Sequence, residues 1–168
     1  MPATYQPIST TTLSSAVNTV TISSITQTYT DLVLVVSNVR DSAGGSSVVA
    51  FRYNGDTGSK YSTTYMGASG AGGLFSSYRT SDTGIWLGGM YSVRGMFKLD
   101  IINYSNTTTY KTSLSRQSFV GTAYEPTGMY CGTWRSTSAI SSITVYSIDI
   151  SPLFDTGTVI SLYGIKSA

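Results

Sequence analysis

The stretch FRYNGDTGSKYS, from Phe51 to Ser62, carries polar side chains that could hold a cation, contact a sugar or turn the chain. A calcium loop needs several oxygen ligands at fixed spacing, and Asp56 is the only carboxylate in this stretch. Asn54 and Gly55 follow an alternating pattern, and both residue types tolerate the positive φ angles of a type I′ turn. The stretch therefore predicts a hairpin or tight turn, with contact to a glycan or another partner as the alternative.

Acid–base chemistry has few candidate residues in this chain. The sequence contains no histidine, which is the usual general base, metal ligand and triad member. A glycosidase needs two carboxylates on either side of a bond, but the single glutamate, Glu125, precedes Pro126 in an expected loop. The glycine-rich segments lack the Lys-Ser/Thr ending of a phosphate-binding loop. These patterns predict a protein that is not an enzyme and has no cofactor and no metal site.

The thirteen tyrosines and two tryptophans suggest sugar stacking, but the same residue types also favour cross-strand packing. Trp86 lies between Ile85 and Leu87, which predicts a core position, whereas exposure is predicted for Trp134, which has polar surroundings, and for Tyr61 and Tyr65. Core or interface packing is the favoured interpretation for the aromatic residues as a group. The residues predicted to bind a partner are Tyr5, Asn54, Asp56, Tyr61, Tyr65, Trp134 and Arg135.

The composition is poor in charge and rich in hydroxyl groups. Charged residues make up 11% of the chain, against about 25% in typical soluble domains. Serine and threonine account for 53 of the 168 residues. Hydroxyl groups are desolvated at lower cost than charges, so this surface favours association with other proteins. The 40% content of hydrophobic residues predicts a folded chain.

The net charge of +2 comes from ten basic residues that are spread singly along the chain. Nucleic-acid binding requires basic residues clustered on one face, so the sequence predicts no nucleic-acid partner. Cys131 is the only cysteine, and we interpret it as a small buried residue. The longest apolar run, Leu32 to Val36, is far shorter than the roughly 20 residues of a membrane helix. The N-terminus resembles no signal peptide, so we expect a soluble protein that is made in a cytoplasm and contacts no membrane.

The pattern of the chain is that of β-structure. Period-two alternation of apolar residues occurs around Val20, Phe51, Leu99 and Thr112, with Gly, Asn, Asp and Pro clusters in between. The run Leu32 to Val36 is apolar on both faces, which predicts a central strand. About ten short strands without helical crossovers predict an all-β fold, an antiparallel β-sandwich of jelly-roll type.

Two segments lack clear alternation. Residues 1–12 contain Pro2, Pro7 and a Ser/Thr tract, and they predict an extended N-terminal arm ahead of a single β-sandwich domain over residues 13–168. The segment Gly67 to Gly73 predicts a long loop that a partner would order.

Five stretches resemble a recurring module of structural proteins from tailed bacteriophages, especially phages of aquatic bacteria and cyanobacteria. They are TVTISSITQTYTDLVLVV (19–36), FRYNGDTGSKYS (51–62), INYSNTTTYKTSLSR (102–116), TWRSTSAISSITVYS (133–147) and GTVISLYGIK (157–166). The resemblance spans nearly the whole chain, and residues 78–96 are among its least similar parts.

The resemblance implies a virion protein, and two functions remain open. In the first, a symmetric oligomer, expected to be a homotrimer, decorates the capsid and cements the major capsid protein. Several attachment points per oligomer would convert weak contacts into tight occupancy. In the second, the domain belongs to a tail or fibre and binds a host glycan through Tyr and Trp. The resemblance implies no catalytic or ligand residues.

Overall fold

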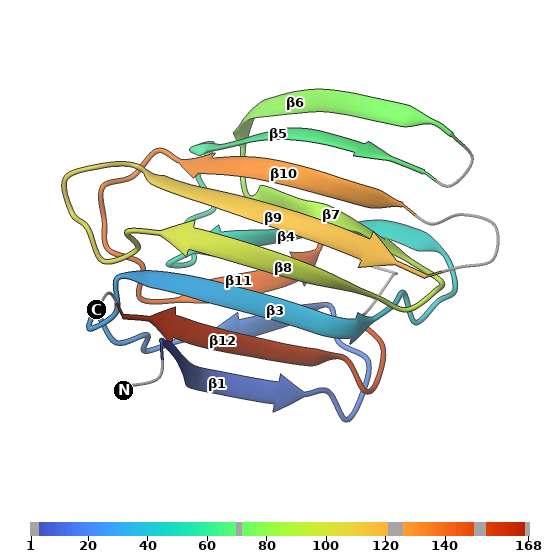
Figure 1. Ribbon diagram of the computed structural model, residues 1–168, viewed down its shortest axis with the longest axis horizontal. Helices are drawn as coiled ribbons and strands as arrows, with labels where there is room; N and C mark the ends of the chain where they lie inside the picture. Colours follow the sequence, from blue (N-terminus) through green and yellow to red (C-terminus); the bar gives the residue numbers. More distant parts are fainter. Residues whose placement is uncertain (1–3, 70–71, 121–125, 150–153, 167–168) are drawn as a thin grey trace.

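The computed structural model describes residues 4–69, 72–120, 126–149 and 154–166. All regular elements in these residues are β-strands, which form two antiparallel sheets, one in front of the other (Figure 1). The predicted all-β, antiparallel sandwich is confirmed. The structure contains twelve strands in its described parts, two more than the sequence pattern indicated.

The larger sheet has eight strands. Its order is β1 (Tyr5–Thr12), β12 (Val159–Ile165), β3 (Asp31–Val39), β8 (Gly95–Ile102), β9 (Lys111–Phe119), β10 (Thr127–Trp134), β5 (Tyr61–Ala68) and β6 (Leu74–Asp82). In Figure 1 this sheet runs from β6 at the top to β1 at the bottom.

The smaller sheet has four strands and lies behind the larger one in Figure 1. Its order is β2 (Thr19–Ile22), β11 (Ile143–Ser147), β4 (Ser46–Tyr53) and β7 (Ile85–Tyr91). The chain passes repeatedly from one sheet to the other, as it does in a jelly roll. We call the face of the larger sheet that points toward the smaller one its inner face, and the opposite face its outer face.

Strand β3 is central, as its doubly apolar sequence predicted. It pairs with β12 on one side and with β8 on the other. Leu32, Leu34 and Val36 alternate onto the inner face and belong to the hydrophobic core. Val33 points to the outer face and is nevertheless buried, between its strand neighbours Tyr163 and Asp100. Both faces of β3 are therefore apolar because residues on both faces are buried.

Strand β9 directs polar residues into the sandwich, against expectation. The alternation around Thr112 predicted that Tyr110, Thr112 and Leu114 share the buried face, but Tyr110 and Thr112 are exposed. The buried side chains of β9 other than Phe119 are polar: Lys111, Ser113, Ser115 and Gln117. Ser115 donates a hydrogen bond of 3.1 Å to the Leu87 carbonyl of the opposite sheet. The register predicted from hydrophobicity is thus shifted by one residue in this strand.

Residues 5–12 are not a separate arm, and the predicted boundary at residue 12 is corrected. They form the edge strand β1, which pairs with β12 along its length. Ile8 packs against the core, and the hydroxyl groups of Thr10 and Ser161 lie 3.1 Å apart. Alternation failed as a signal here because no residue of β1 is fully buried on either face and Pro7 adjoins a register shift. Residues 1–3 lie outside the described residues.

We expect that deletion of residues 1–12 destabilises the sandwich, because it removes the partner strand of β12 and uncovers the core beside Ile8. The expected loss is about 2 kcal/mol, which corresponds to a thermal midpoint roughly 4 to 8 °C lower for a domain of this size. Differential scanning calorimetry measures the shift. A chain that begins at Thr4 keeps β1 and serves as the control. Equal midpoints for the two truncated chains would contradict the structural role of β1.

Candidate functional site

Residues 53–56 form a tight turn, as the sequence predicted. Asn54 and Gly55 have φ angles of 52° and 65°, and the Asp56 amide donates a hydrogen bond of 2.9 Å to the Tyr53 carbonyl. Two central residues with positive φ define a turn of type I′. The turn does not close a hairpin, because β4 belongs to the smaller sheet and β5 to the larger one. It is a crossing point between the sheets.

The side chain of Asn54 fixes the chain segment before β11. Its Nδ2 donates to the Ala139 carbonyl at 2.8 Å. Its Oδ1 accepts hydrogen bonds from the backbone amides of Ser141, at 2.8 Å, and Ser142, at 3.1 Å. The amide group therefore has its partners within the protein, and its main role is structural.

Asp56 is likewise engaged by its own protein. It accepts hydrogen bonds from the Gly58 amide (2.9 Å), from Trp134 Nε1 (2.9 Å) and from Lys60 Nζ (3.1 Å). Partial burial would raise the pKa of Asp56, but these three hydrogen bonds outweigh it and hold the pKa below the ordinary 3.8. The carboxylate anchors the turn to β10.

Tyr61 and Trp134 were predicted to be exposed, and this prediction is wrong. Both are buried on the inner face, where their rings stack with centroids 6.2 Å apart. The Tyr61 hydroxyl donates to the Asp56 carbonyl at 3.0 Å and accepts from the Tyr53 amide at 3.2 Å. The polar neighbours of Trp134 in the sequence suggested exposure, but alternation within β10 turns Trp134 to the inner face, as it does Tyr130 and Gly132.

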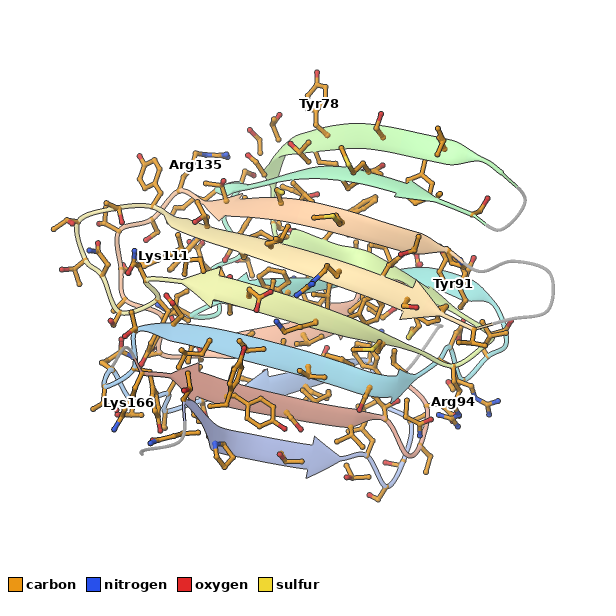
Figure 2. The ribbon with its side chains drawn as sticks, viewed as in Figure 1. Tyr78, Tyr91, Arg94, Lys111, Arg135 and Lys166 are labelled. Atoms are coloured by element: carbon orange, nitrogen blue, oxygen red, sulfur yellow. The ribbon has the colours of Figure 1, made fainter. Side chains whose placement is uncertain are left out.

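Arg135 lies at the same end of the larger sheet and is half-buried, as Figure 2 shows. It donates hydrogen bonds to the Ser62 hydroxyl and, at 3.0 Å, to the Ser59 carbonyl. Five of the seven predicted partner residues are thus brought together, but as a structural cluster: Asn54, Asp56, Tyr61, Trp134 and Arg135. Tyr5 and Tyr65 lie elsewhere.

Tyr65 belongs to an aromatic stack on the inner face, near the free edge of β7. Its ring stacks on Trp86 at 5.6 Å and on Tyr130 at 5.4 Å. The guanidinium of Arg79 lies 4.3 Å from the centre of the Trp86 ring, a cation–π contact. Trp86 is therefore half-exposed at this edge and not the core residue that its neighbours predicted. Both faces of Tyr65 are occupied by protein.

Lys111 is a buried cation that the sequence did not single out, and Figure 2 places it at the end of the sandwich where β9 begins. Its ammonium donates to the carbonyls of Thr109, at 2.9 Å, and Thr137, at 3.3 Å. Burial lowers the pKa of Lys111 below the usual 10.5. Both contacts are to backbone, so Lys111 ties two loops together.

The outer face of the larger sheet is the surface that the sequence did not predict. Of the ten exposed large hydrophobic side chains in the described residues, seven lie on this face according to the strand registers. They are Tyr5, Met66, Leu74, Tyr78, Met96, Ile102 and Met129. Cys131 is also exposed on this face, so its interpretation as a buried residue is wrong. Contiguous apolar exposure marks interaction surfaces, and on this face the exposed apolar side chains adjoin one another where Met66, Leu74 and Met129 line one groove.

Hydroxyl groups and a small ion cluster separate these apolar side chains. Asp100 accepts hydrogen bonds from Lys98 at 2.7 Å and from Arg116 at 3.5 Å, in the middle of the face. Toward β6 the face becomes apolar, and Met66, Leu74 and Met129 line an open groove of about 560 Å³. The face combines nearly balanced charge with apolar contact area, which suits a protein partner.

The described residues hold no group of three or more Cys, Asp and Glu side chains that could bind a metal ion. They also contain no helix of the length and apolarity that crossing a membrane would require.

No protein-family model matches the chain, and no curated protein matches it. Similar solved structures include the CBM2 module of the evolved Dit of Lactobacillus casei BL23 phage J-1, with 12% sequence identity, 89% of this chain and 69% of that chain covered, and a TM-score of 0.29. A toad ovary galectin in complex with thio-digalactose has 8% sequence identity and a TM-score of 0.26. The match covers 89% of this chain and 96% of the galectin chain. SCP-B of the Eqolisin family of peptidases has 9% identity, 91% and 65% coverage, and a TM-score of 0.25. At these scores no family and no activity is transferred to this chain.

We expect Asp56→Asn to destabilise the protein at neutral pH by about 2 kcal/mol, the usual size for hydrogen bonds to a charged group. Because the folded-state pKa of Asp56 is lowered, its contribution is complete above the unfolded-state pKa near 3.8 and is lost as the pH falls through the folded-state pKa. The difference between wild type and variant should therefore shrink below about pH 5. Urea unfolding at a series of pH values measures it.

Lys60→Met is the matched control for this prediction. The Lys60 side chain is 53% exposed, and exposed ion pairs contribute about 0 to 1 kcal/mol. If Lys60→Met cost as much as Asp56→Asn, the ion pair rather than Trp134 and the turn would account for the stability.

Proposed function

We propose that this chain is a non-enzymatic structural protein of a tailed-phage virion, a cement protein that binds the capsid shell as a symmetric oligomer. The observation that carries the proposal is the outer face of the larger sheet, where seven large hydrophobic side chains are exposed among hydroxyl groups. The resemblance of five stretches to phage structural modules supplies the biological setting.

A cement protein must hold a preformed shell without distorting itself, and the outer face has the chemistry for this. The face is presented by a rigid sheet whose other side is packed in the core, so little conformational entropy is lost on binding. Met96 and Ile102, which are 42% and 47% exposed, lie near the two ends of β8, a strand in the middle of the sheet. In our proposal the outer face along β8 contacts the shell.

A non-catalytic role agrees with the use of the carboxylates in the described residues. Asp56, Asp100 and Asp155 are held in ion pairs, and Asp155 accepts hydrogen bonds from Arg40 at 2.5 Å and Arg94 at 3.0 Å. The Arg40 hydrogen bond is the main cause that lowers the pKa of Asp155. Groups held in this way stabilise the fold.

The alternative, a tail or fibre module that binds a host glycan, depends on open aromatic faces. Trp134 and Tyr61 are buried, and Tyr65 is stacked on both sides. The aromatic residues predicted to contact a sugar therefore present little free ring surface, with Tyr5 as the exposed exception. The predicted sugar-contacting residues therefore give the glycan role little support, and the other exposed tyrosines are Tyr78 and Tyr110, at 72% and 57%.

We expect the purified protein to bind stripped capsids of the phage that encodes it, at hundreds of copies per particle. The double variant Met96→Glu/Ile102→Glu should bind at least about tenfold more weakly, because charge on a buried apolar contact is costly to desolvate. Co-sedimentation with quantified band intensities measures occupancy.

The matched control is Thr21→Glu/Ile148→Glu, which adds the same charge at exposed residues in and next to the smaller sheet, away from this face. It should bind like wild type. Absence of capsid binding, or labelling of the virion at the tail alone, would overturn the proposal. Binding to a glycan array without capsid binding would support the tail alternative.

A further inference from the structure

The described residues have four sheet edges, and three of them are protected. Strand β2 has only four residues, and β1 carries Pro7 next to a register shift. Strand β7 lies under the larger sheet, where the Thr63 hydroxyl accepts a hydrogen bond of 3.1 Å from the Trp86 amide. Short edges, proline, bulges and cover are the devices that prevent edge-to-edge pairing.

The fourth edge, β6, has none of these devices between Leu74 and Tyr78, and the register shift in its pairing with β5 lies beyond, between Arg79 and Asp82. Its nine residues span about 30 Å in extended form, and seven of them are exposed. No described residue pairs with the free edge of β6, the edge that points away from β5. A row of backbone amides and carbonyls is therefore available along that edge. The strand also retains apolar side chains in solvent, with Leu74 88% and Tyr78 72% exposed. Figure 2 shows Tyr78 extending from β6 away from the molecule.

We propose that β6 pairs with β6 of a second copy, antiparallel and around a twofold axis, so that the two larger sheets become one continuous sheet. A second copy fits because β6 is compatible with itself. The charges of the strand, Arg79 and Asp82, form an ion pair of 3.0 Å at its C-terminal end, which leaves residues 74–78 uncharged. With the twofold axis at residue 77 or 78, Arg79 lies opposite Phe75 or Ser77 of the second copy, so like charges do not face each other directly.

The alternation of side chains limits the register. For the outer faces of both copies to lie on the same side of the joined sheet, the twofold axis must pass midway between the two copies of one β6 residue. That residue then lies opposite itself, and the axis is named here by that residue. An axis through Tyr78 places the two Tyr78 rings opposite each other, a favourable cross-strand pair. An axis through Ser77 pairs Phe75 with Arg79, whereas an axis through Arg79 would bring the two Arg79 side chains together and is disfavoured.

The neighbouring groove adds contact area to the backbone pairing. Met66, Leu74 and Met129 line it directly beside β6 on the outer face. Addition of a strand to the edge would place side chains of the second copy next to this groove and would cover apolar surface. This proposal does not depend on capsid binding, because the shell contact was assigned to β8.

Sedimentation velocity between micromolar and millimolar concentrations tests the proposal, with a dimer expected for wild type. Leu74→Lys/Tyr78→Lys should raise the dimer dissociation constant at least about tenfold, because lysine on an edge opposes pairing. Tyr110→Lys/Val120→Lys carries the same added charge at exposed residues off β6 and should dimerise like wild type. Circular dichroism of all variants checks that they fold.

Disulfide trapping tests the register independently. In a Cys131→Ser background, oxidation of Tyr78→Cys should give a covalent dimer if the axis passes through residue 78, and Ser77→Cys should do so if it passes through residue 77. Paired residues of antiparallel strands have Cα atoms about 4.5 to 5.5 Å apart, within reach of a disulfide. Tyr110→Cys is the control that should remain uncrosslinked.

Three results would overturn the proposal. They are a monomeric wild type at millimolar concentration, an oligomer that the β6 lysines leave intact, and crosslinking at residues 77 and 78 no greater than at residue 110. A protein that is purely trimeric would also contradict a twofold contact. Loss of dimerisation with intact capsid binding would separate this proposal from the proposed function.

Discussion

A sheet of four strands cannot cover a sheet of eight, and this mismatch determines which parts of the larger sheet are buried. Strand β7, at the edge of the smaller sheet, packs against β5, β8, β9 and β10, and β6 lies beyond it. The core fills the space between the sheets, and the stack of Tyr65 with Trp86 and Tyr130 closes it at the β7 edge. Strand β6 is consequently exposed on both faces.

The same architecture explains why residues that suggested a ligand site serve the fold instead. Each passage between the sheets needs a turn whose polar groups are satisfied, and residues 53–56 make such a passage. Asn54 accepts a hydrogen bond from the backbone amide of Ser141, and Asp56 accepts one from the backbone amide of Gly58. Asp56 also accepts a hydrogen bond from Nε1 of the buried Trp134 indole. Polar side chains with glycine in a loop therefore indicate a turn at least as well as they indicate binding.

The sequence predicted the elements whose burial alternates. Strand β3 and the turn at Asn54 followed from hydrophobicity and φ preferences, and both are confirmed. Strand β6 was missed because a strand exposed on both faces has no period-two signal, and in β9 the buried positions are polar, including Lys111 and Gln117. The outer face was beyond sequence reasoning because it is assembled from distant strands. The homotrimer expected from the resemblance stays untested, and the twofold contact proposed at β6 is an alternative to it.

The two proposed contacts use perpendicular directions of one sheet, so they do not compete. A shell on the outer face approaches along the normal of the sheet, toward side chains such as Met96 and Ile102, and gains mainly from apolar burial. A second copy at β6 approaches in the plane of the sheet and gains mainly from backbone hydrogen bonds. Pairing at β6 would double the area of outer face held by one rigid body, and linked contacts dissociate far more slowly than single ones. In this proposal, a chain with only 11% charged residues holds a shell mainly through many weak, uncharged contacts.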